Sequence, residues 1–189
     1  MLKSIQEIID YNIMFLQNQK DTGFGHYGPV CEETALIQDF LIQMNQKGLI
    51  TSCSQPGIIS QDYKQRSFVE FLCPKELVER FRYLNNISLG WVTTTEMFCQ
   101  GFISEPITYV NNEPTTFNPL GALLELNCTL EDTTLELFES RVEPELIKFL
   151  NENYAHVIMY DTIWGRKNYL FNCILTTDLE IKKGAVIQV

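Results

Sequence analysis

The sequence predicts an α+β fold, with about four helices packed on a mainly antiparallel sheet of six or more short strands. The length of 189 residues is typical of one domain, so we expect residues 1–189 to share one core. Apolar residues recur at helical spacing in separate segments, and short stretches rich in β-branched and aromatic residues lie between them. The chain carries no repeat at a fixed period, which argues against a solenoid.

The expected helices are defined by apolar spacing and by terminal signals. In the first, Ile5, Ile9 and Leu16 lie on one side and Asp10 lies on the other. The second begins with acidic residues that complement the helix dipole and ends before Gly48, and the last two have a proline near their first position. The expected helices cover residues 5–16, 32–47, 74–84 and 143–153.

The expected strands are short and bounded by turn signals. Residues 49–53 are β-prone and lead into a Pro-Gly turn at residues 54–57. Residues 111–121 are the most loop-like stretch, while residues 123–128 and 130–139 fit neither period cleanly. Further strands are expected at residues 65–73 and at two or three segments within 88–110. Residues 156–160 and 169–175, on either side of a turn at 161–166, are expected to form a late hairpin or two neighbouring strands.

The charge of the chain argues against one class of partner. Fourteen Lys and Arg stand against 24 Asp and Glu, which gives a net charge of −10. A protein that binds by neutralising phosphates needs the opposite sign, so we expect no nucleic-acid polymer as a partner. The 45% hydrophobic and 12% aromatic content is that of a globular chain rather than a disordered one.

Cysteine usage and hydropathy predict the compartment. The six cysteines include no C-x-x-C pair, and no apolar stretch reaches the roughly 18 residues of a membrane span. The N-terminal segment lacks the continuous apolar region of a signal peptide. We therefore expect free thiols, a reducing and cytoplasmic location, and no membrane partner.

Four clusters of polar residues are candidates for a site. The first lies at the expected start of the second helix, where free backbone N–H groups can bind an anion. The second lies in the turn after the first strand, where ligand contacts often occur. The third is an arginine at a strand start, whose planar guanidinium can bind a carboxylate or phosphate. Their residues are Glu32, Glu33 and Thr34, then Ser54 and Gln55, then Arg66. In the fourth cluster, Asp161, Trp164 and Arg166 place an acid, an indole and a guanidinium in one turn, which suits a planar ligand.

Each cluster also has a structural interpretation. The two glutamates complement the helix dipole, and Pro-Gly is a common turn. An arginine at a strand start is often a surface charge. A tryptophan beside an Asp–Arg ion pair often covers a core.

A catalytic hypothesis uses Cys31, His156 and Asp161. Papain-type hydrolases place the thiol at a helix N-terminus, take the base from a later strand and orient it with an Asn or Asp. The order along the chain matches, although the structural alternative is an inert thiol and the chain has only two histidines. The other histidine, His26 in the glycine-rich loop, is a second candidate base.

No established cofactor motif occurs in the sequence. The chain has no P-loop, no H-E-x-x-H helix and no EF-hand loop. Residues 23–28 are glycine-rich but follow a helix, whereas the dinucleotide fingerprint follows a strand. We therefore expect no cofactor and no metal.

Several short motifs occur in a fixed order along residues 28–166. They are Gly28-Pro29 with Glu32-Glu33-Thr34, Asn45 with residues 48–51, residues 54–57 (SQPG), Gln65-Arg66, and residues 161–166 (DTIWGR). Together they resemble an uncharacterised domain family of actinobacteria and some large DNA viruses, for which a viral member would act in the host cytoplasm. The resemblance implies that these motifs converge on one cleft. Cys31 stands where the family pattern has Asp, which puts a shared cysteine nucleophile in doubt, and Thr162 replaces Pro.

These observations predict a polar cleft for a small anionic ligand, such as a nucleotide-derived molecule, with hydrolase or transferase chemistry. Glu32, Glu33 and Asp161 are the expected acid and base residues. The expected ligand-binding residues are Thr34, Ser54, Gln55, Arg66, Trp164 and Arg166. Two alternatives are open: a cysteine hydrolase or deamidase that uses Cys31, His156 and Asp161, and a non-enzymatic viral or bacterial effector whose acidic surface binds a basic partner.

Overall fold

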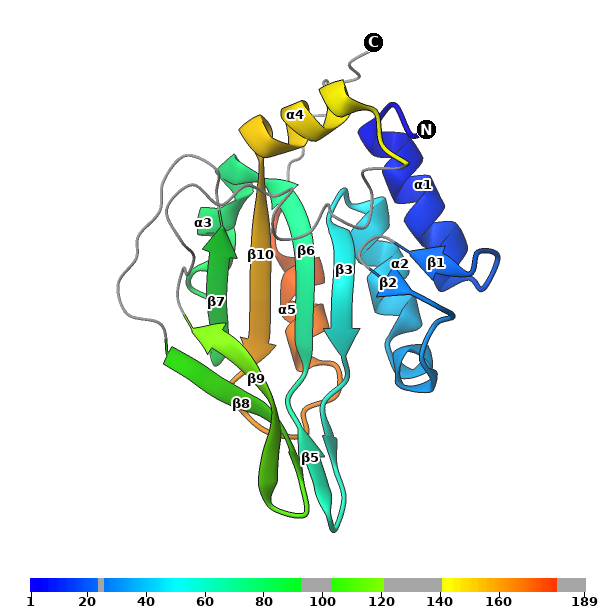
Figure 1. Ribbon diagram of the computed structural model, residues 1–189. Coiled ribbons are helices and arrows are strands. Elements are labelled where there is room, and N and C mark those ends of the chain that lie inside the picture. The colour runs from blue at the N-terminus through cyan, green and yellow to red at the C-terminus, as the bar shows by residue number, and fades with distance from the viewer. Residues whose placement is uncertain (24–25, 93–102, 121–140, 180–189) are drawn as a thin grey trace.

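A four-stranded antiparallel sheet, in the order β3-β6-β10-β7, forms the centre of the fold (Figure 1). The computed structural model describes residues 1–23, 26–92, 103–120 and 141–179. The strands of this central sheet are β3 (Ile50–Gln55), β6 (Phe68–Pro74), β10 (Tyr154–Asp161) and β7 (Ile87–Val92). The two inner strands, β6 and β10, are buried along most of their length, as their apolar and aromatic sequences favour.

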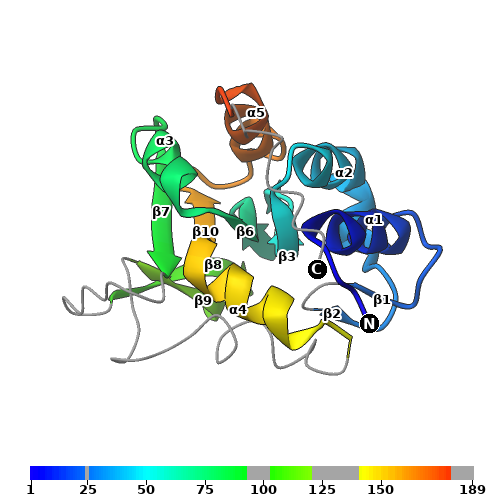
Figure 2. The same ribbon diagram turned by 90° about the horizontal axis from the view of Figure 1, so that it is seen from above.

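Helices cover the two faces of the central sheet unequally (Figure 2). Helices α2, α3 and α5 lie along one face, with α1 beside α2, whereas α4 lies on the side of the other face. Ser4 caps α1 by accepting a hydrogen bond from the Glu7 N–H at 3.2 Å, and Pro144 occupies the first turn of α4. The helices are α1 (Ile5–Leu16), α2 (Gln38–Gln46), α3 (Val78–Phe81), α4 (Pro144–Asn153) and α5 (Tyr169–Thr176).

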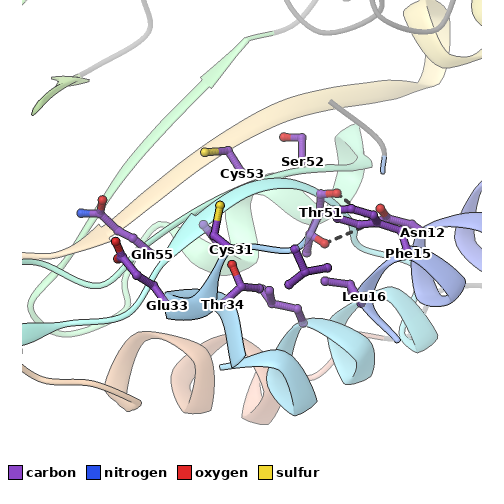
Figure 3. Close-up of a pocket in the computed structure, with 13 residues that line it drawn as sticks. Asn12, Phe15, Leu16, Cys31, Glu33, Thr34, Thr51, Ser52, Cys53 and Gln55 are labelled. Carbon is purple, nitrogen blue, oxygen red and sulfur yellow. Dashed lines mark hydrogen bonds between the residues drawn. The ribbon is translucent and has the colours of Figure 1, made fainter. Parts of the chain in front are cut away.

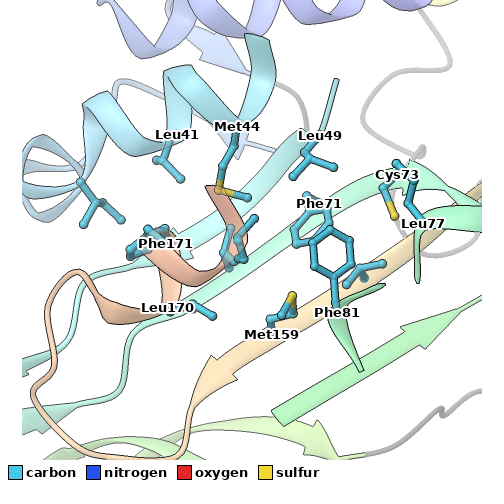
Figure 4. Packing of buried hydrophobic residues seen from close by; sticks show 14 of the residues in the cluster. Leu41, Met44, Leu49, Phe71, Cys73, Leu77, Phe81, Met159, Leu170 and Phe171 are labelled. Carbon is cyan, nitrogen blue, oxygen red and sulfur yellow. The ribbon is translucent and has the colours of Figure 1, made fainter. Parts of the chain in front are cut away.

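The alternation of side chains along the inner strands divides the core in two. Val69 and Phe71 of β6 pack with α2, α3 and α5, whereas Leu72 packs with α1 and α4. In the larger cluster, the Phe71 and Phe81 rings meet edge to face with their centroids 5.5 Å apart (Figure 4). The central sheet is therefore the scaffold that holds every helix in place.

A second antiparallel sheet, in the order β4-β5-β8-β9, extends from the lower end of the central sheet (Figure 1). Its strands are β4 (Ile58–Ile59), β5 (Tyr63–Gln65), β8 (Ile103–Val110) and β9 (Glu113–Leu120), while β1 (Thr22–Gly23) and β2 (His26–Tyr27) pair separately. A small cluster of Phe68, Ile107 and Tyr160 joins the two sheets. The outer strand β9 contains Pro114 and Pro119, which have no backbone N–H.

Two buried asparagines bind the outer edge of β3. Asn12 of α1 donates from Nδ2 to the Thr51 carbonyl at 2.8 Å and to Asn45 Oδ1 at 2.9 Å. Asn45 of α2 donates from Nδ2 to Thr51 Oγ1 at 2.8 Å and to the Leu41 carbonyl at 2.8 Å. A buried edge strand has backbone groups without a neighbouring strand, and the two amides supply partners for them at Thr51.

The α+β class and the four expected helical segments are confirmed; α1 has the expected bounds, and the other three helices are shorter than expected. The second and third expected helices begin as 3-10 turns, η1 (Glu32–Leu36) and η2 (Lys75–Leu77), before α2 and α3 follow. Within the described residues, no helix is long and apolar enough to cross a membrane.

Two expected segments are wrong. Residues 169–175, expected as a hairpin strand, lie in helix α5, because Leu170, Phe171 and Ile174 share one helical face and are all buried. The expected loop at residues 111–121 contains β9, which pairs with β8 despite its two prolines. The ambiguous segments 123–128 and 130–139 lie outside the described residues.

We predict that Asn12→Ala lowers the free energy of unfolding by about 2–3 kcal/mol, because the Thr51 carbonyl and Asn45 Oδ1 lose a buried donor. Urea denaturation followed by circular dichroism measures the change. The control is Gln6→Ala on the exposed side of α1, where Gln6 bonds only to Asp10 among the described residues, with an expected change within about 0.5 kcal/mol. Equal effects of the two variants would contradict a structural role for the asparagine network.

Candidate functional site

A pocket of about 220 Å³ lies beside the outer edge of β3 (Figure 3). Its walls come from α1, from the segment around η1, from α2 and from β3. The lining residues with polar side chains are Asn12, Cys31, Glu33, Thr34, Thr51, Ser52, Cys53, Ser54 and Gln55, and Phe15, Leu16, Val30 and Leu41 supply the apolar floor. The pocket therefore brings together segments that are far apart in the sequence.

A β-bulge in β3 shapes one wall of the pocket. Thr51 pairs with Phe71 and Cys53 pairs with Glu70, so Ser52 is an extra residue on this strand. The Ser52 and Cys53 side chains consequently lie next to each other (Figure 3). The Ser52 hydroxyl oxygen is buried and has no hydrogen-bond partner among the residues that the structure describes.

The opposite wall comes from the segment around η1. Cys31 directly precedes this 3-10 turn, and the α-helix itself begins only at Gln38. The expected placement of Cys31 at the N-terminus of an α-helix is therefore wrong, and the helix dipole does not act on its thiol in the way that the sequence suggested. Glu33 and Thr34 line the pocket, whereas Glu32 is exposed and lies outside the lining.

Gln65 links this wall to the turn after β3. Its buried side chain donates from Nε2 to Glu33 Oε2 at 2.9 Å and to the Pro56 carbonyl at 2.6 Å, and its Oε1 accepts a hydrogen bond from the Tyr63 hydroxyl. Gln55 donates from Nε2 to the Arg66 carbonyl at 3.0 Å. Residues 54–57 and residues 65–66 are therefore joined by hydrogen bonds.

Arg66 is held by backbone oxygens and an indole ring. Its guanidinium donates to the carbonyls of Pro106, at 3.3 Å from Nε, and Thr162. The guanidinium carbon also lies 4.1 Å from the centre of the Trp164 ring, a cation–π contact. Lys64 contacts the same ring, with Nζ 5.0 Å from its centre. Arg66 and Trp164 are thus neighbours, but the Arg66 guanidinium is bound to backbone carbonyls and to the Trp164 ring of the protein itself.

Asp161 and Arg166 form a two-pronged ion pair. Arg166 donates from Nε to Asp161 Oδ2 at 2.8 Å and from Nη2 to Oδ1 at 2.6 Å. Asp161 is fully buried and also accepts the Ile163 N–H at 2.9 Å. The hydrogen bonding of the Arg166 guanidinium to the Asp161 carboxylate, which accepts, is the main cause that raises the pKa of Arg166. This pair closes the turn that follows β10.

The polar contacts between the two sheets form what we call the junction, made by Gln55, Gln65, Arg66, Ser67, Asp161 and Arg166. Ser67 donates from Oγ to the carbonyls of Arg166 and Lys167, the latter at 3.2 Å. Gly57 lies so close to this turn that an added Cβ would stand 2.7 Å from the Arg166 oxygen, so a side chain is excluded there. Three of the sequence motifs, residues 54–57, 65–66 and 161–166, meet in the junction.

The predicted site residues divide into two groups. Glu33, Thr34, Ser54 and Gln55 line the pocket, whereas Asp161 stands apart with its carboxylate bound to an arginine in the junction. Arg66 and Arg166 belong to the junction, Trp164 contacts the Arg66 guanidinium through its ring, and Glu32 belongs to neither group. The residues that sequence reasoning missed are Ser52 and Cys53 in the bulge and Asn12 in α1, because no short motif marks them.

The structure does not bring His156 and Asp161 together. They are five residues apart on β10, and an odd separation on a strand directs side chains to opposite faces. The carboxylate beside His156 is that of Glu70, with Oε2 3.4 Å from His156 Nε2. Within the described residues, no group of three His, Cys, Asp or Glu side chains has the geometry to hold a metal ion.

Cys53 borders the pocket, and its thiol strongly favours the protonated form. Loss of solvent around the thiol is the largest cause that raises the pKa of Cys53, and the negative charge of Glu70 is the next. Together they raise the pKa from 9.0 to about 12. Only about one Cys53 thiol in ten thousand is ionised at pH 8 with such a pKa. The thiolate is the reactive form, so Cys53 is a poor nucleophile at neutral pH.

We predict that iodoacetamide alkylates Cys53 slowly at pH 8 and that the rate still increases between pH 9 and pH 11. Glu70→Gln should raise the rate several-fold, because it removes the carboxylate charge that opposes ionisation. Peptide mapping by mass spectrometry measures the rate at each cysteine. The control is Glu76→Gln, which removes a charge near Cys73 instead. A Cys53 rate that levels off near pH 9 would contradict the raised pKa.

We also predict that Asp161→Asn lowers the free energy of unfolding by about 2 kcal/mol or more, because Arg166 loses its buried carboxylate partner. Thermal and urea unfolding measure the effect. The matched control is Glu79→Gln, which removes the exposed Glu79–Arg82 pair and should change stability by less than about 1 kcal/mol. A similar cost for both variants would show that the junction does not depend on this ion pair.

Comparison with known proteins identifies a family without a known activity. No curated protein matches the sequence. The family model described as "Domain of unknown function (DUF6919)" matches residues 2–180, which is nearly the whole chain. The chain therefore belongs to this uncharacterised domain family.

Proposed function

We propose that the pocket beside β3 binds a small polar molecule that carries hydrogen-bond donors or a positive charge. The observation that supports this proposal is the chemistry of its lining: hydroxyls, thiols, amides and the Glu33 carboxylate border about 220 Å³ of space, together with four apolar side chains. Pockets for drug-sized ligands occupy roughly 300–1,000 Å³. The favoured ligand is therefore closer in size to an amino acid than to a whole nucleotide.

The charge of the lining decides the kind of ligand. Among the described residues that line the pocket, Glu33 is charged, and there is no Lys, Arg or His. A carboxylate favours cations and N–H donors and opposes anions. The two arginines expected to clamp an anion are bound elsewhere, Arg66 to backbone carbonyls and Arg166 to Asp161. We therefore favour a neutral or cationic ligand over the anionic one suggested by the sequence.

Hydrolysis of a substrate by a cysteine nucleophile is not favoured as the reaction. Such a nucleophile must be a thiolate, which requires a nearby base. The candidate base His156 lies beside Glu70 rather than Asp161. Cys53, the thiol near Glu70, has a pKa raised to about 12. We therefore propose a binding function for this pocket and assign no covalent step to its cysteines.

Other expectations from the sequence stay proposals. They include a cytoplasmic and reducing location, the absence of a nucleic-acid polymer as partner, and the occurrence of the family in actinobacteria and large DNA viruses. The alternative of an acidic interaction protein is also a prediction, for which the described surface supplies no specific partner.

The test is a binding screen with defined probes of amino-acid size: amino-acid amides, diamines and guanidines, with acetate and inorganic phosphate as anionic comparisons. We predict shifts in the amide NMR signals of Thr34 and residues 52–55 with the cationic or amide probes. Glu33→Gln should weaken binding of the best cationic probe about tenfold, equivalent to about 1.4 kcal/mol. The substitution keeps an oxygen that can accept from Gln65.

The matched control is Glu32→Gln, which removes the neighbouring carboxylate outside the lining and should leave binding unchanged. Stronger shifts with phosphate than with the diamines, or equal losses in the two glutamate variants, would overturn the proposed ligand class. A screen without any shift in residues 52–55 would overturn the pocket itself.

A further inference from the structure

The pocket beside β3 has a polar end and an apolar end. Figure 3 shows Glu33 and Gln55 at one end of the lining, and Phe15 and Leu16 at the other. A wholly polar ligand would leave the apolar end uncovered, and a wholly apolar one would leave the carboxylate without a partner. A ligand that matches both ends therefore needs a polar head and an apolar body.

The polar end offers oxygen atoms that can accept hydrogen bonds. Glu33 is exposed, and its Oε2 accepts from Gln65 Nε2 at 2.9 Å. Gln55 uses Nε2 to donate to the Arg66 carbonyl at 3.0 Å. Among the residues that the structure describes, no donor reaches the other side-chain oxygen of Glu33 or of Gln55. An ammonium group has three N–H donors and no acceptor, so it suits these oxygens.

The charge of Glu33 has no counter-ion within the described part of the chain. None of the ion pairs found there includes Glu33, and the described lining holds no Lys, Arg or His. Burial raises the pKa of Tyr63, and the nearby Glu33 carboxylate raises it further. A cationic head would balance this charge, whereas a ligand with its own carboxylate beside the head, such as a free amino acid, would meet it.

The apolar end has no polar group left for a second charge. Asn12 lies near Phe15 in Figure 3, but its amide is bound to the Thr51 carbonyl at 2.8 Å. A second ammonium placed there would lose its water without gaining a partner. Each methylene of an apolar body buried there would instead tighten binding about threefold. The apolar side chains of the lining are Phe15, Leu16, Val30 and Leu41.

We propose that the ligand of this pocket is a primary monoamine with an apolar body of about four to six carbon atoms, its ammonium group bound by Glu33 and Gln55. The size follows from the volume: a water molecule occupies about 30 Å³ in the liquid, so about 220 Å³ holds about seven atoms of that size. This inference rests on the proposed function, because both use the Glu33 carboxylate, and it adds the class of molecule.

The experiment is an NMR titration of the full chain with primary alkylamines from methylamine to octylamine at neutral pH. The amide signals of Thr34 and residues 52–55 give the dissociation constants. We expect the affinity to rise about threefold for each methylene up to pentylamine or hexylamine, and to stop rising at octylamine. Pentan-1-ol and 1,5-diaminopentane, which match pentylamine in carbon number, should each bind about fivefold more weakly or worse.

A variant in the apolar lining separates the body of the ligand from its head. Val30→Thr places a hydroxyl of similar size in the lining and should weaken pentylamine binding about fivefold. Methylamine, which does not reach the apolar end, should bind this variant as it binds the original chain, and this also shows that the pocket is intact. The matched control is Val110→Thr, an exposed valine of β8, which should leave both affinities unchanged.

The outcomes distinguish this inference from the proposed function. Affinity that is independent of chain length, tighter binding of 1,5-diaminopentane than of pentylamine, or equal losses in Val30→Thr and Val110→Thr would each overturn the monoamine. If any of these occurs while Glu33→Gln still weakens methylamine binding, the proposed function stands and only this inference fails. If pentan-1-ol binds as tightly as pentylamine and Glu33→Gln has no effect, recognition of a cation fails, and the monoamine fails with it.

Discussion

The outer edge of β3 is the constraint on which the rest of this structure depends. A strand at the border of a sheet has backbone groups that need partners, and here that border faces α1 and α2 instead of another strand. At Thr51, the amides of Asn12 and Asn45 provide these partners in the interior. One residue later the bulge at Ser52 ends this arrangement, and the space beside the strand is the pocket. The part of this edge at Thr51 is therefore buried in the core, and the part from Ser52 onward forms a wall of the pocket.

The junction shows why several sequence motifs lie close together without forming an open cleft. Gln65 is 1% exposed and Asp161 is fully buried, and both are bound to groups of the protein itself. Their contacts tie the short strands of the second sheet to the end of β10. The same residue types that suggest ligand binding in a sequence therefore serve here to orient loops, and the pocket beside them uses other side chains.

Sequence reasoning found the helices because their apolar residues recur over several turns, as in α1 and α4. It failed for α5, because a run of eight mostly apolar residues is too short to show whether its pattern has the period of a helix or of a strand. The structure shows which residues are buried, among them Leu170 and Ile174, and this identifies the helical face. Glu33, Thr34, Ser54 and Gln55, which line the pocket, are predicted as site residues from the sequence because they are polar residues at an expected helix start or in a turn. Ser52 was missed because a bulge changes the direction of a side chain through strand pairing, which a single segment does not reveal.

The prolines of β9 affect how this protein behaves at high concentration. β9 is the last strand of the second sheet, and an eight-residue outer strand would normally offer a row of free N–H groups to a strand of another molecule. Pro114 and Pro119 have no N–H group, so this strand has fewer donors to offer to a strand of another molecule. The strand that resembled a loop in the sequence is therefore a poor template for aggregation.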